Sequence, residues 1–244
     1  MFTSKKQFNT NSNALYYSEN LTRQSIASPE GLDFIADPVD FTLAPIALSR
    51  GASHLAIGKK NGDVEVWNLL TQTNVQFKAH SDAVCGIGIL LTPKRHRLLT
   101  VALDGQLHLW DLKNPSAPMA SAQLGEIPDD RGWPVSLRFS PEGNLVATAS
   151  LTQLKVFGGE DLRAIRDFEL NGRSLVLRFS PDGQYLVSSN EAPEGIGVWE
   201  TRNWTHRFLP GHDTIPSDLT FSPDGRRMVS GSDDLFGIPN PGSS

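Results

Sequence analysis

The feature that most constrains this chain is a short phrase that recurs at a nearly fixed spacing. Ser-Pro-Asp-Gly or Ser-Pro-Glu-Gly follows a phenylalanine at Phe139, Phe179 and Phe221, which are 40 and 42 residues apart. A second aromatic series has similar spacings of 43, 47 and 42 residues and consists of Trp67, Trp110, Phe157 and Trp199. Two independent markers with one period indicate that a structural unit of about 40 to 47 residues repeats along the chain.

Each repeat predicts β-strands on both sides of the phrase. Val135, Leu137 and Phe139 alternate with polar residues before the first of these turns, which is typical of a strand with one apolar face. In the phrase itself, proline presets φ for a turn and glycine accepts a positive φ, so the phrase predicts a hairpin corner. Further β-rich stretches follow each corner, so one period is expected to hold four strands.

A single four-stranded sheet of this size cannot shield both of its faces, so the repeats are expected to stack. Radial stacking produces a β-propeller, which leaves only short sheet edges. The sequence therefore predicts an all-β propeller with about five recognisable blades, the last of them incomplete. We expect residues 1–13 to be a disordered tail and 14–244 to be the propeller, with units at about 45–80, 83–124, 134–170, 174–210 and 217–244.

The repeats resemble the WD40 family, whose units carry a Gly-His pair early and Trp-Asp at the third strand. The resemblance extends over roughly residues 45–234 and is best in the second unit, which contains Ala79-His80, Asp104-Gly105 and Trp110-Asp111. It implies a WD40-type β-propeller. It also implies a buried structural hydrogen-bond network in this unit, formed by His80, Thr100, Asp104 and Trp110.

The other units depart from the family pattern. Trp67 is followed by Asn68, Phe157 replaces the tryptophan, and an inserted loop at 191–195 stands where the turn aspartate is expected. Only one full network is therefore predicted. In the last unit, Pro239 and Pro241 cannot donate to a strand ladder, so the propeller is expected to stop within that blade.

Composition excludes several classes of function. The formal net charge is −5, which argues against nucleic acid as a partner, and the basic run at 94–97 is interpreted as a solvated loop. Cys85 is the only cysteine, so a disulfide within the chain and a multi-thiolate metal site are excluded. No signal peptide or membrane span is indicated. We expect a cytoplasmic protein, with the nucleus as the alternative.

No pattern in the sequence predicts catalysis. The six histidines show no metal-ligand spacing, and the Asp-Asp pairs at 129–130 and 233–234 are expected to lie solvated on turns. Nucleophile-elbow, phosphate-loop and dinucleotide-binding motifs do not occur. We therefore expect no enzyme activity, no metal and no cofactor.

The residues that the repeat pattern does not explain lie in loops, and loops on a rigid scaffold are where binding residues concentrate. Aromatic residues and arginine are also enriched at interaction hot spots. The expected function is therefore a non-catalytic scaffold that presents loops of the narrower rim to a protein partner. The candidate binding residues are Asp129, Asp130, Arg131, Trp133, Glu191 and Glu194. Two alternatives are a ligand-sensing or regulatory propeller within a larger multidomain protein and, less favoured, an enzyme that uses the central channel.

An incomplete ring would expose apolar sheet faces and strand edges, which favour association. The sequence leaves three possibilities open. A protein partner or a second copy completes the propeller, residues 14–41 fold back to close it, or the chain is a truncated fragment. Truncation and completion by a partner are favoured, and the open edges also allow self-association.

Overall fold

The computed structural model describes residues 44–125, 127, 135–150, 152–191 and 193–232. Within these residues the chain forms eighteen strands and no helix. The predicted tail at 1–13 and the segment 14–41 lie outside the described residues.

The strands pair antiparallel with their neighbours in the chain and form five successive sheets. Sheet 1 consists of β1 (Ile46–Leu48), β2 (His54–Gly58), β3 (Asp63–Asn68) and β4 (Thr73–Lys78). Sheet 2 consists of β5 (Val84–Leu91), β6 (His96–Ala102), β7 (Gln106–Asp111) and β8 (Ala120–Gln123). Sheet 3 consists of β9 (Ser136–Phe139), β10 (Leu145–Ala149), β11 (Gln153–Gly158) and β12 (Ala164–Glu169). Sheet 4 consists of β13 (Ser174–Phe179), β14 (Tyr185–Asn190), β15 (Ile196–Glu200) and β16 (His206–Leu209), and sheet 5 of β17 (Asp218–Phe221) and β18 (Met228–Gly231).

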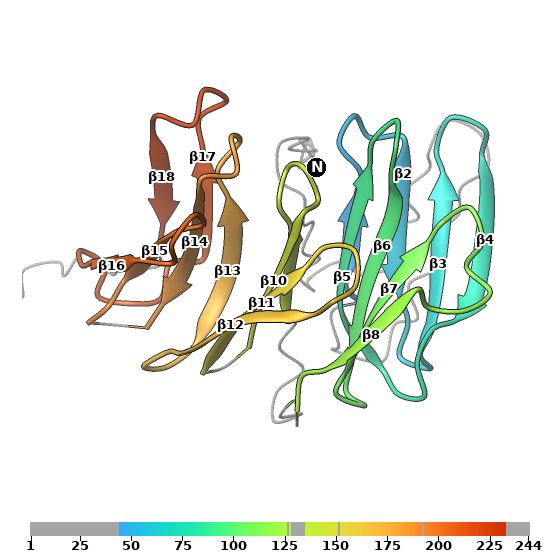
Figure 1. The fold of residues 1–244 in the computed structure, drawn as a ribbon, viewed down its shortest axis with the longest axis horizontal. Coiled ribbons are helices and arrows are strands. Elements are labelled where there is room, and N and C mark those ends of the chain that lie inside the picture. Colours follow the sequence, from blue (N-terminus) through green and yellow to red (C-terminus); the bar gives the residue numbers. More distant parts are fainter. Residues whose placement is uncertain (1–43, 126, 128–134, 151, 192, 233–244) are drawn as a thin grey trace, which may run out of the picture.

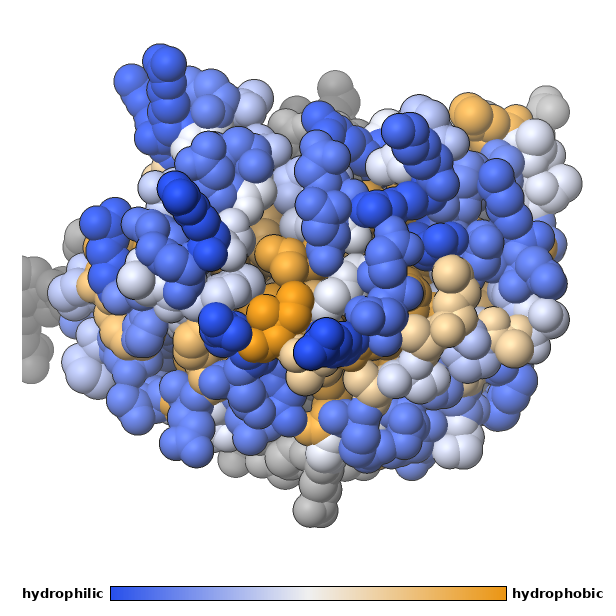
Figure 2. Space-filling model, viewed as in Figure 1, coloured by the Kyte–Doolittle hydropathy of each residue, from blue (hydrophilic) through white to orange (hydrophobic). Residues whose placement is uncertain are grey.

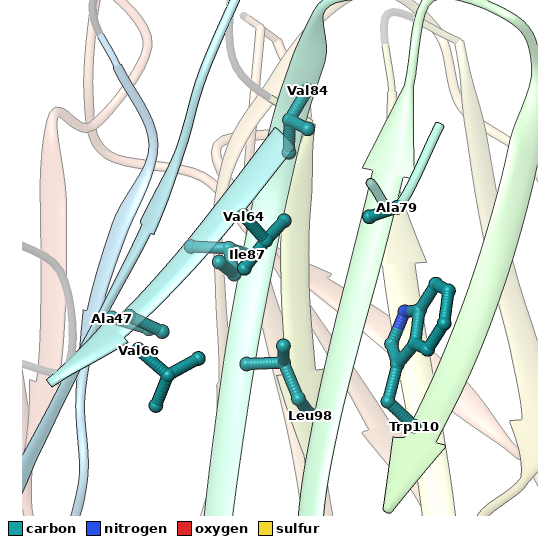
Figure 3. Close-up of a cluster of buried hydrophobic side chains, with 9 residues drawn as sticks. Ala47, Val64, Val66, Ala79, Val84, Ile87, Leu98 and Trp110 are labelled. Carbon is teal, nitrogen blue, oxygen red and sulfur yellow. The ribbon is translucent and has the colours of Figure 1, made fainter. Parts of the chain in front are cut away.

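The sheets stand side by side in chain order (Figure 1). We call the face that a sheet turns toward the preceding sheet its leading face, and the opposite face its trailing face. Alternation along β6 illustrates the two faces, because Leu98 packs with sheet 1 whereas Leu99 packs with sheet 3. Figure 3 shows one such layer, in which Ala47 and Val66 of sheet 1 lie opposite Leu98 of sheet 2. The core is thus a series of apolar layers between successive sheets.

The ends of the sheets form two rims. The connection rim carries the connections between sheets and the turn from the second to the third strand of each sheet. The turn rim, at the other end, carries the hairpin from the first to the second strand, which in sheets 3 to 5 is the recurring Ser-Pro-acidic-Gly phrase. Hydrophilic residues cover much of the face seen in Figure 2, and apolar residues gather near its middle, in the region of β10 to β12.

The recurring turns stack on one another along the turn rim. Gly183 lies beside Pro141 of the previous sheet, so that a Cβ on Gly183 would be 3.5 Å from the proline Cδ. Gly225 lies beside Pro181 in the same way, also at 3.5 Å. Both glycines have a positive φ, of 71° and 70°. Each turn therefore provides the surface on which the next turn packs, which explains why the phrase recurs with the period of the sheets.

The predicted fold class is confirmed, since the described residues form four four-stranded antiparallel sheets followed by a two-stranded one. The described sheets do not close into a ring (Figure 1). Pro239 and Pro241, which were expected to end the last blade, lie outside the described residues.

The basic run at 94–97 was expected to be a solvated loop, and this interpretation is wrong for its arginines. β6 begins at His96, and Arg95 Nη2 lies 2.7 Å from Glu160 Oε1 of sheet 3. Arg97 pairs with Asp111 at 3.5 Å and is only 14% exposed in its side chain. The arginines instead link sheets 2 and 3 at the turn rim, which the pattern of charge along the sequence could not reveal.

Candidate functional site

Four side chains of sheet 2 and of the connection before it form a continuous hydrogen-bond chain. Trp110 Nε1 donates to Thr100 Oγ1 at 2.9 Å, and Thr100 Oγ1 lies 2.7 Å from His80 Nε2. His80 Nδ1 lies 3.2 Å from both carboxylate oxygens of Asp104. With the Nδ1–H tautomer, His80 donates to Asp104 and accepts from Thr100, so every member has a partner. The structure thus brings the four predicted network residues together.

Burial and hydrogen bonding determine the protonation states of His80 and Asp104 in this network. His80 is 4% exposed, and burial lowers the pKa of its imidazole despite the opposing effect of the neighbouring Asp104 carboxylate. Burial raises the pKa of Asp104, but hydrogen bonds from Gln106 and Ser81 and the proximity of His80 outweigh it and hold that pKa below its usual value. A neutral histidine beside an ionised aspartate is the state in which the hydrogen bonds above are complete.

The network fixes two segments of the connection rim to each other. Asp104, in the β6–β7 turn, accepts the backbone N–H of Ser81 at 3.2 Å and that of Gln106 at 3.0 Å. Ser81 belongs to the connection from sheet 1 to sheet 2, so one carboxylate joins this connection to a turn of the next sheet. His108 stacks on the His80 ring with centroids 4.4 Å apart, which restricts the imidazole further. The site is therefore a support for the rim.

The other sheets carry only parts of this network. His212 Nε2 lies 2.8 Å from Ser230 Oγ, which repeats the His80–Thr100 pair in sheet 5. In sheet 4, Trp199 is 1% exposed and its Nε1 has no hydrogen-bond partner in the described part of the chain. Ser188, which occupies the position of Thr100, lies instead 2.8 Å from the buried amide of Asn190. The complete network thus occurs in sheet 2 alone among the described sheets.

In three of the sheets, a glycine lets the turn between the second and third strands pack closely against another segment of the connection rim. Gly62, Gly105 and Gly195 each follow the second strand, have φ between 68° and 84°, and abut a carbonyl oxygen in or directly before the connection to the next sheet. A Cβ on Gly62 would lie 2.2 Å from His80 O, and one on Gly105 would lie 2.5 Å from Gly125 O. Only glycine allows this close approach, which holds the rim segments in fixed positions.

Two of the six predicted binding residues lie on this rim in the described structure. Glu191 is exposed and exchanges hydrogen bonds with Arg173, whose backbone nitrogen lies 3.3 Å from Glu191 Oε2. Glu194 Oε1 accepts from Asn171 Nδ2 at 2.7 Å. The inserted loop therefore lies against the connection from sheet 3 to sheet 4. The other four predicted residues lie outside the described residues and are Asp129, Asp130, Arg131 and Trp133.

No sequence motif marks the partners of this loop. Asn171 and Arg173 follow β12 and carry no motif, so only the pairing of neighbouring sheets places them beside Glu194 and Glu191. A small recess on the same rim, between sheets 2 and 3, was also not predicted. Its lining residues are Leu124, Ile127, Val135, Thr148, Ser150, Gln153 and Lys155. Lys155 Nζ donates to Leu124 O at 2.9 Å across this recess.

Among the residues that the structure describes, no group of three or more His, Cys, Asp or Glu side chains is placed to hold a metal ion. The same described residues contain no helix with the length and apolar character needed to cross a membrane.

The stacked four-stranded sheets and the buried network define a repeat protein of the β-propeller type. A family model for the WD domain, G-beta repeat, matches residues 71–111 and 204–235. Together, the fold, the repeat matches and the relatives described below support a WD40-repeat family for this chain. Proteins of this family generally serve as non-catalytic scaffolds for protein interactions.

Two curated proteins are similar to this chain in sequence. Periodic tryptophan protein 2 of Arabidopsis thaliana is 27% identical over 197 residues, which cover 78% of this chain and 21% of that protein. WD repeat-containing protein SL1-17 of Schistosoma mansoni is 25% identical over 191 residues, which cover 76% of this chain and 60% of that protein. The chain therefore spans about a fifth of the length of the first relative and three fifths of the second.

Proposed function

We propose that this chain is a non-catalytic scaffold that binds a protein partner through the loops of its connection rim, with Glu191 and Glu194 as contact residues. Loops held by a rigid sheet scaffold are well suited to binding, because little conformational entropy is lost when a partner docks. The hydrogen bonds from Asn171 and Arg173 hold this loop in one position. Of the four predicted residues outside the described part, Trp133 is the one tested below.

The carboxylate of Glu194 carries the proposal. Its Oε2 is buried and has no hydrogen-bond partner among the described residues, while Oε1 is held by Asn171. A buried acceptor without a donor is costly, and a partner relieves this cost if docking moves the loop enough to bring an N–H or ammonium group to Oε2. The exposed Glu191 carboxylate in the same loop adds negative charge. Together these groups favour a partner with a basic or N–H-rich surface.

The test is a quantitative capture experiment from cell extract with the wild-type chain and rim variants. Glu191→Gln and Glu194→Gln both keep the shape of the loop and remove a negative charge. The amide oxygen that Glu194→Gln introduces can still accept from Asn171. Trp133→Ala tests the predicted loop between the second and third units. We expect the proteins retained by the wild type to bind the rim variants at least about tenfold more weakly, in the range of hot-spot losses.

Glu142→Gln is the matched control, because Glu142 is exposed on the turn rim and the substitution is chemically the same. It should retain the full set of captured proteins. Equal losses with Glu142→Gln and Glu194→Gln, or no loss with any rim variant, would show that the connection rim is not the binding surface. Circular dichroism and unfolding of each variant exclude a general loss of structure.

A further inference from the structure

The recess between sheets 2 and 3 combines an apolar wall with four polar side chains. The apolar wall comes from the connection between β8 and β9 and consists of Leu124, Ile127 and Val135. The polar side chains lie on the leading face of sheet 3 and are those of Thr148, Ser150, Gln153 and Lys155. Binding sites for small groups are typically apolar recesses in which a few polar groups converge. The recess therefore has the composition of such a site.

Three of these polar side chains have no hydrogen-bond partner among the residues that the structure describes. They are the hydroxyls of Thr148 and Ser150 and the amide of Gln153. Thr148 is only 3% exposed, so its hydroxyl is largely shielded from bulk solvent. A buried hydroxyl without a partner costs free energy. Because Thr148 lines the recess, a group bound there can supply the missing partner directly.

The same positions in sheet 2 have partners within the chain. Register pairs Thr148 with Lys155 in sheet 3 and Thr100 with His108 in sheet 2, each across the second and third strands. Thr100 Oγ1 lies 2.7 Å from the ring of His80, which comes from the connection before sheet 2. The threonine of sheet 3 occupies the equivalent position but has no such ring beside it.

The connections explain this difference. Ala79 and Leu124 begin the connections before sheets 2 and 3, and the N–H of each donates to the glycine carbonyl of the preceding turn. Their own carbonyls accept from the third strand of the next sheet, Ala79 O at 3.1 Å and Leu124 O at 2.9 Å. The next residue is His80 in one connection and Gly125 in the other. The recess therefore corresponds to the place that the imidazole fills in sheet 2.

The charge of the recess indicates which group fits it. Lys155 Nζ donates to Leu124 O, and the lysine side chain is 20% exposed. The nearest acidic group, Asp167, lies 3.7 Å from Nζ and is 57% exposed, so this ion pair is weak. The described lining residues include no acidic side chain, and all four polar ones can donate a hydrogen bond. A negatively charged acceptor therefore complements the recess, through charge-assisted hydrogen bonds.

We propose that this recess binds a carboxylate group, with Lys155 Nζ and Thr148 Oγ1 donating to its oxygens and the apolar wall contacting its aliphatic part. The carboxylate comes from a free short-chain acid or from an acidic side chain of a docking protein, and its chemistry is the same in both cases. The proposal is independent of partner binding through Glu191 and Glu194, because those residues lie at the connection between sheets 3 and 4.

Titration of the full-length chain with sodium acetate, followed by two-dimensional NMR, tests the proposal. We expect saturable shifts of the Thr148, Gln153 and Lys155 resonances that sodium chloride at the same concentration does not produce. Lys155→Gln should weaken acetate binding on the order of tenfold or more, and Thr148→Val about threefold or more. Thr148→Val leaves the lysine contact to Leu124 in place, so the test holds even if Lys155→Gln is destabilised.

Lys113→Gln is the matched control, because Lys113 is exposed on the turn rim and the substitution removes the same charge. It should bind acetate as the wild type does. Titrations with sodium butyrate and with a blocked glycine–glutamate–glycine peptide distinguish the two sources. Tighter binding of butyrate assigns the recess to a free acid, and tighter binding of the peptide assigns it to an acidic side chain.

Three results would overturn the proposal. The first is the absence of saturable shifts with all three carboxylates. The second is equal acetate affinity in the wild type, Lys155→Gln and Thr148→Val. The third is equal affinity for acetate and neutral acetamide, since binding would then not depend on the negative charge.

Discussion

At the scale of the single residue, the hydroxyl of Thr100 is the centre of the buried network. It accepts from Trp110 and lies within hydrogen-bonding distance of His80, and Thr100 itself is 0% exposed. The equivalent residue of sheet 3, Thr148, is also buried but makes no side-chain hydrogen bond to the described residues, because Phe157 replaces the tryptophan. The same residue type thus has a hydrogen-bonding role in one sheet and none in the next.

We predict that Thr100→Val destabilises the protein by about 2 to 4 kcal/mol, because two buried polar groups, His80 Nε2 and Trp110 Nε1, lose their partner. Thr148→Val, the same change at the equivalent site, should cost less than about 1 kcal/mol. Urea unfolding monitored by tryptophan fluorescence measures both values. Equal losses in the two variants would show that the network contributes nothing beyond packing.

The lowered pKa of His80 predicts acid sensitivity. Because the folded-state pKa lies below the ordinary value of 6.5, the unfolded chain binds more protons in the interval between them, and stability falls as pH drops through that interval. The fully stabilised state lies above pH 6.5. We expect a loss of up to about 1.4 kcal/mol per pH unit from this group, measured as unfolding free energy between pH 7.5 and 5.

The matched variant for this pH dependence is His80→Gln, which should be less stable at pH 7.5 but show a shallower decline toward pH 5. The decline should not vanish, since burial also lowers the pKa of His54 and His108. An unchanged slope in His80→Gln would mean that His80 does not titrate differently in the folded and unfolded states.

At the scale of the element, the turn from the second to the third strand positions the connection rim. The Gly62 carbonyl accepts the backbone N–H groups of Ala79 and His80 at 3.0 Å, and the Gly105 carbonyl accepts that of Leu124 at 2.9 Å. Each of these carbonyls accepts hydrogen bonds from the connection to the next sheet. Because the same glycine has no side chain, the connection can lie close enough to form these bonds. The turns therefore act as clamps between the body of a sheet and the loop that leads to the next.

Gly62→Ala should destabilise the protein by about 3 kcal/mol or more. A methyl group would add a positive-φ strain of about 1 to 2 kcal/mol and would also meet the His80 carbonyl oxygen, which is backbone and cannot rotate away. Gly51→Ala separates the two effects, because Gly51 has nearly the same φ of 83° and nothing within 4 Å of the added carbon. Thermal unfolding should show the smaller loss for Gly51→Ala, and equal losses would refute the clamp.

At the scale of the whole molecule, the repeat was predictable from sequence because the turn residues and the aromatic residues recur at a nearly fixed spacing. The strands around Phe139, Phe179 and Phe221 follow from these signals. The pairing of Arg95 with Glu160 and of Glu194 with Asn171 could not be predicted, because both depend on which sheet lies beside which. Local alternation identifies the two faces of a strand, but only the stacked structure shows which residues the faces and rims bring together.

The stacked arrangement predicts a gradient of stability along the molecule. In a linear series of sheets, each one is stabilised by its own pairing and by its neighbours. Sheets 2 and 3 are covered on both faces, whereas sheet 5 has two strands, packs on sheet 4 only among the described sheets, and exposes Val229 by 67%. Native-state hydrogen exchange should therefore be on the order of ten to a thousand times faster in β18 than in β6, where Leu98, Leu99 and Val101 are fully buried. Equal protection of β18 and β6 would mean that sheet 5 has a second neighbour in solution and that the series of sheets is closed.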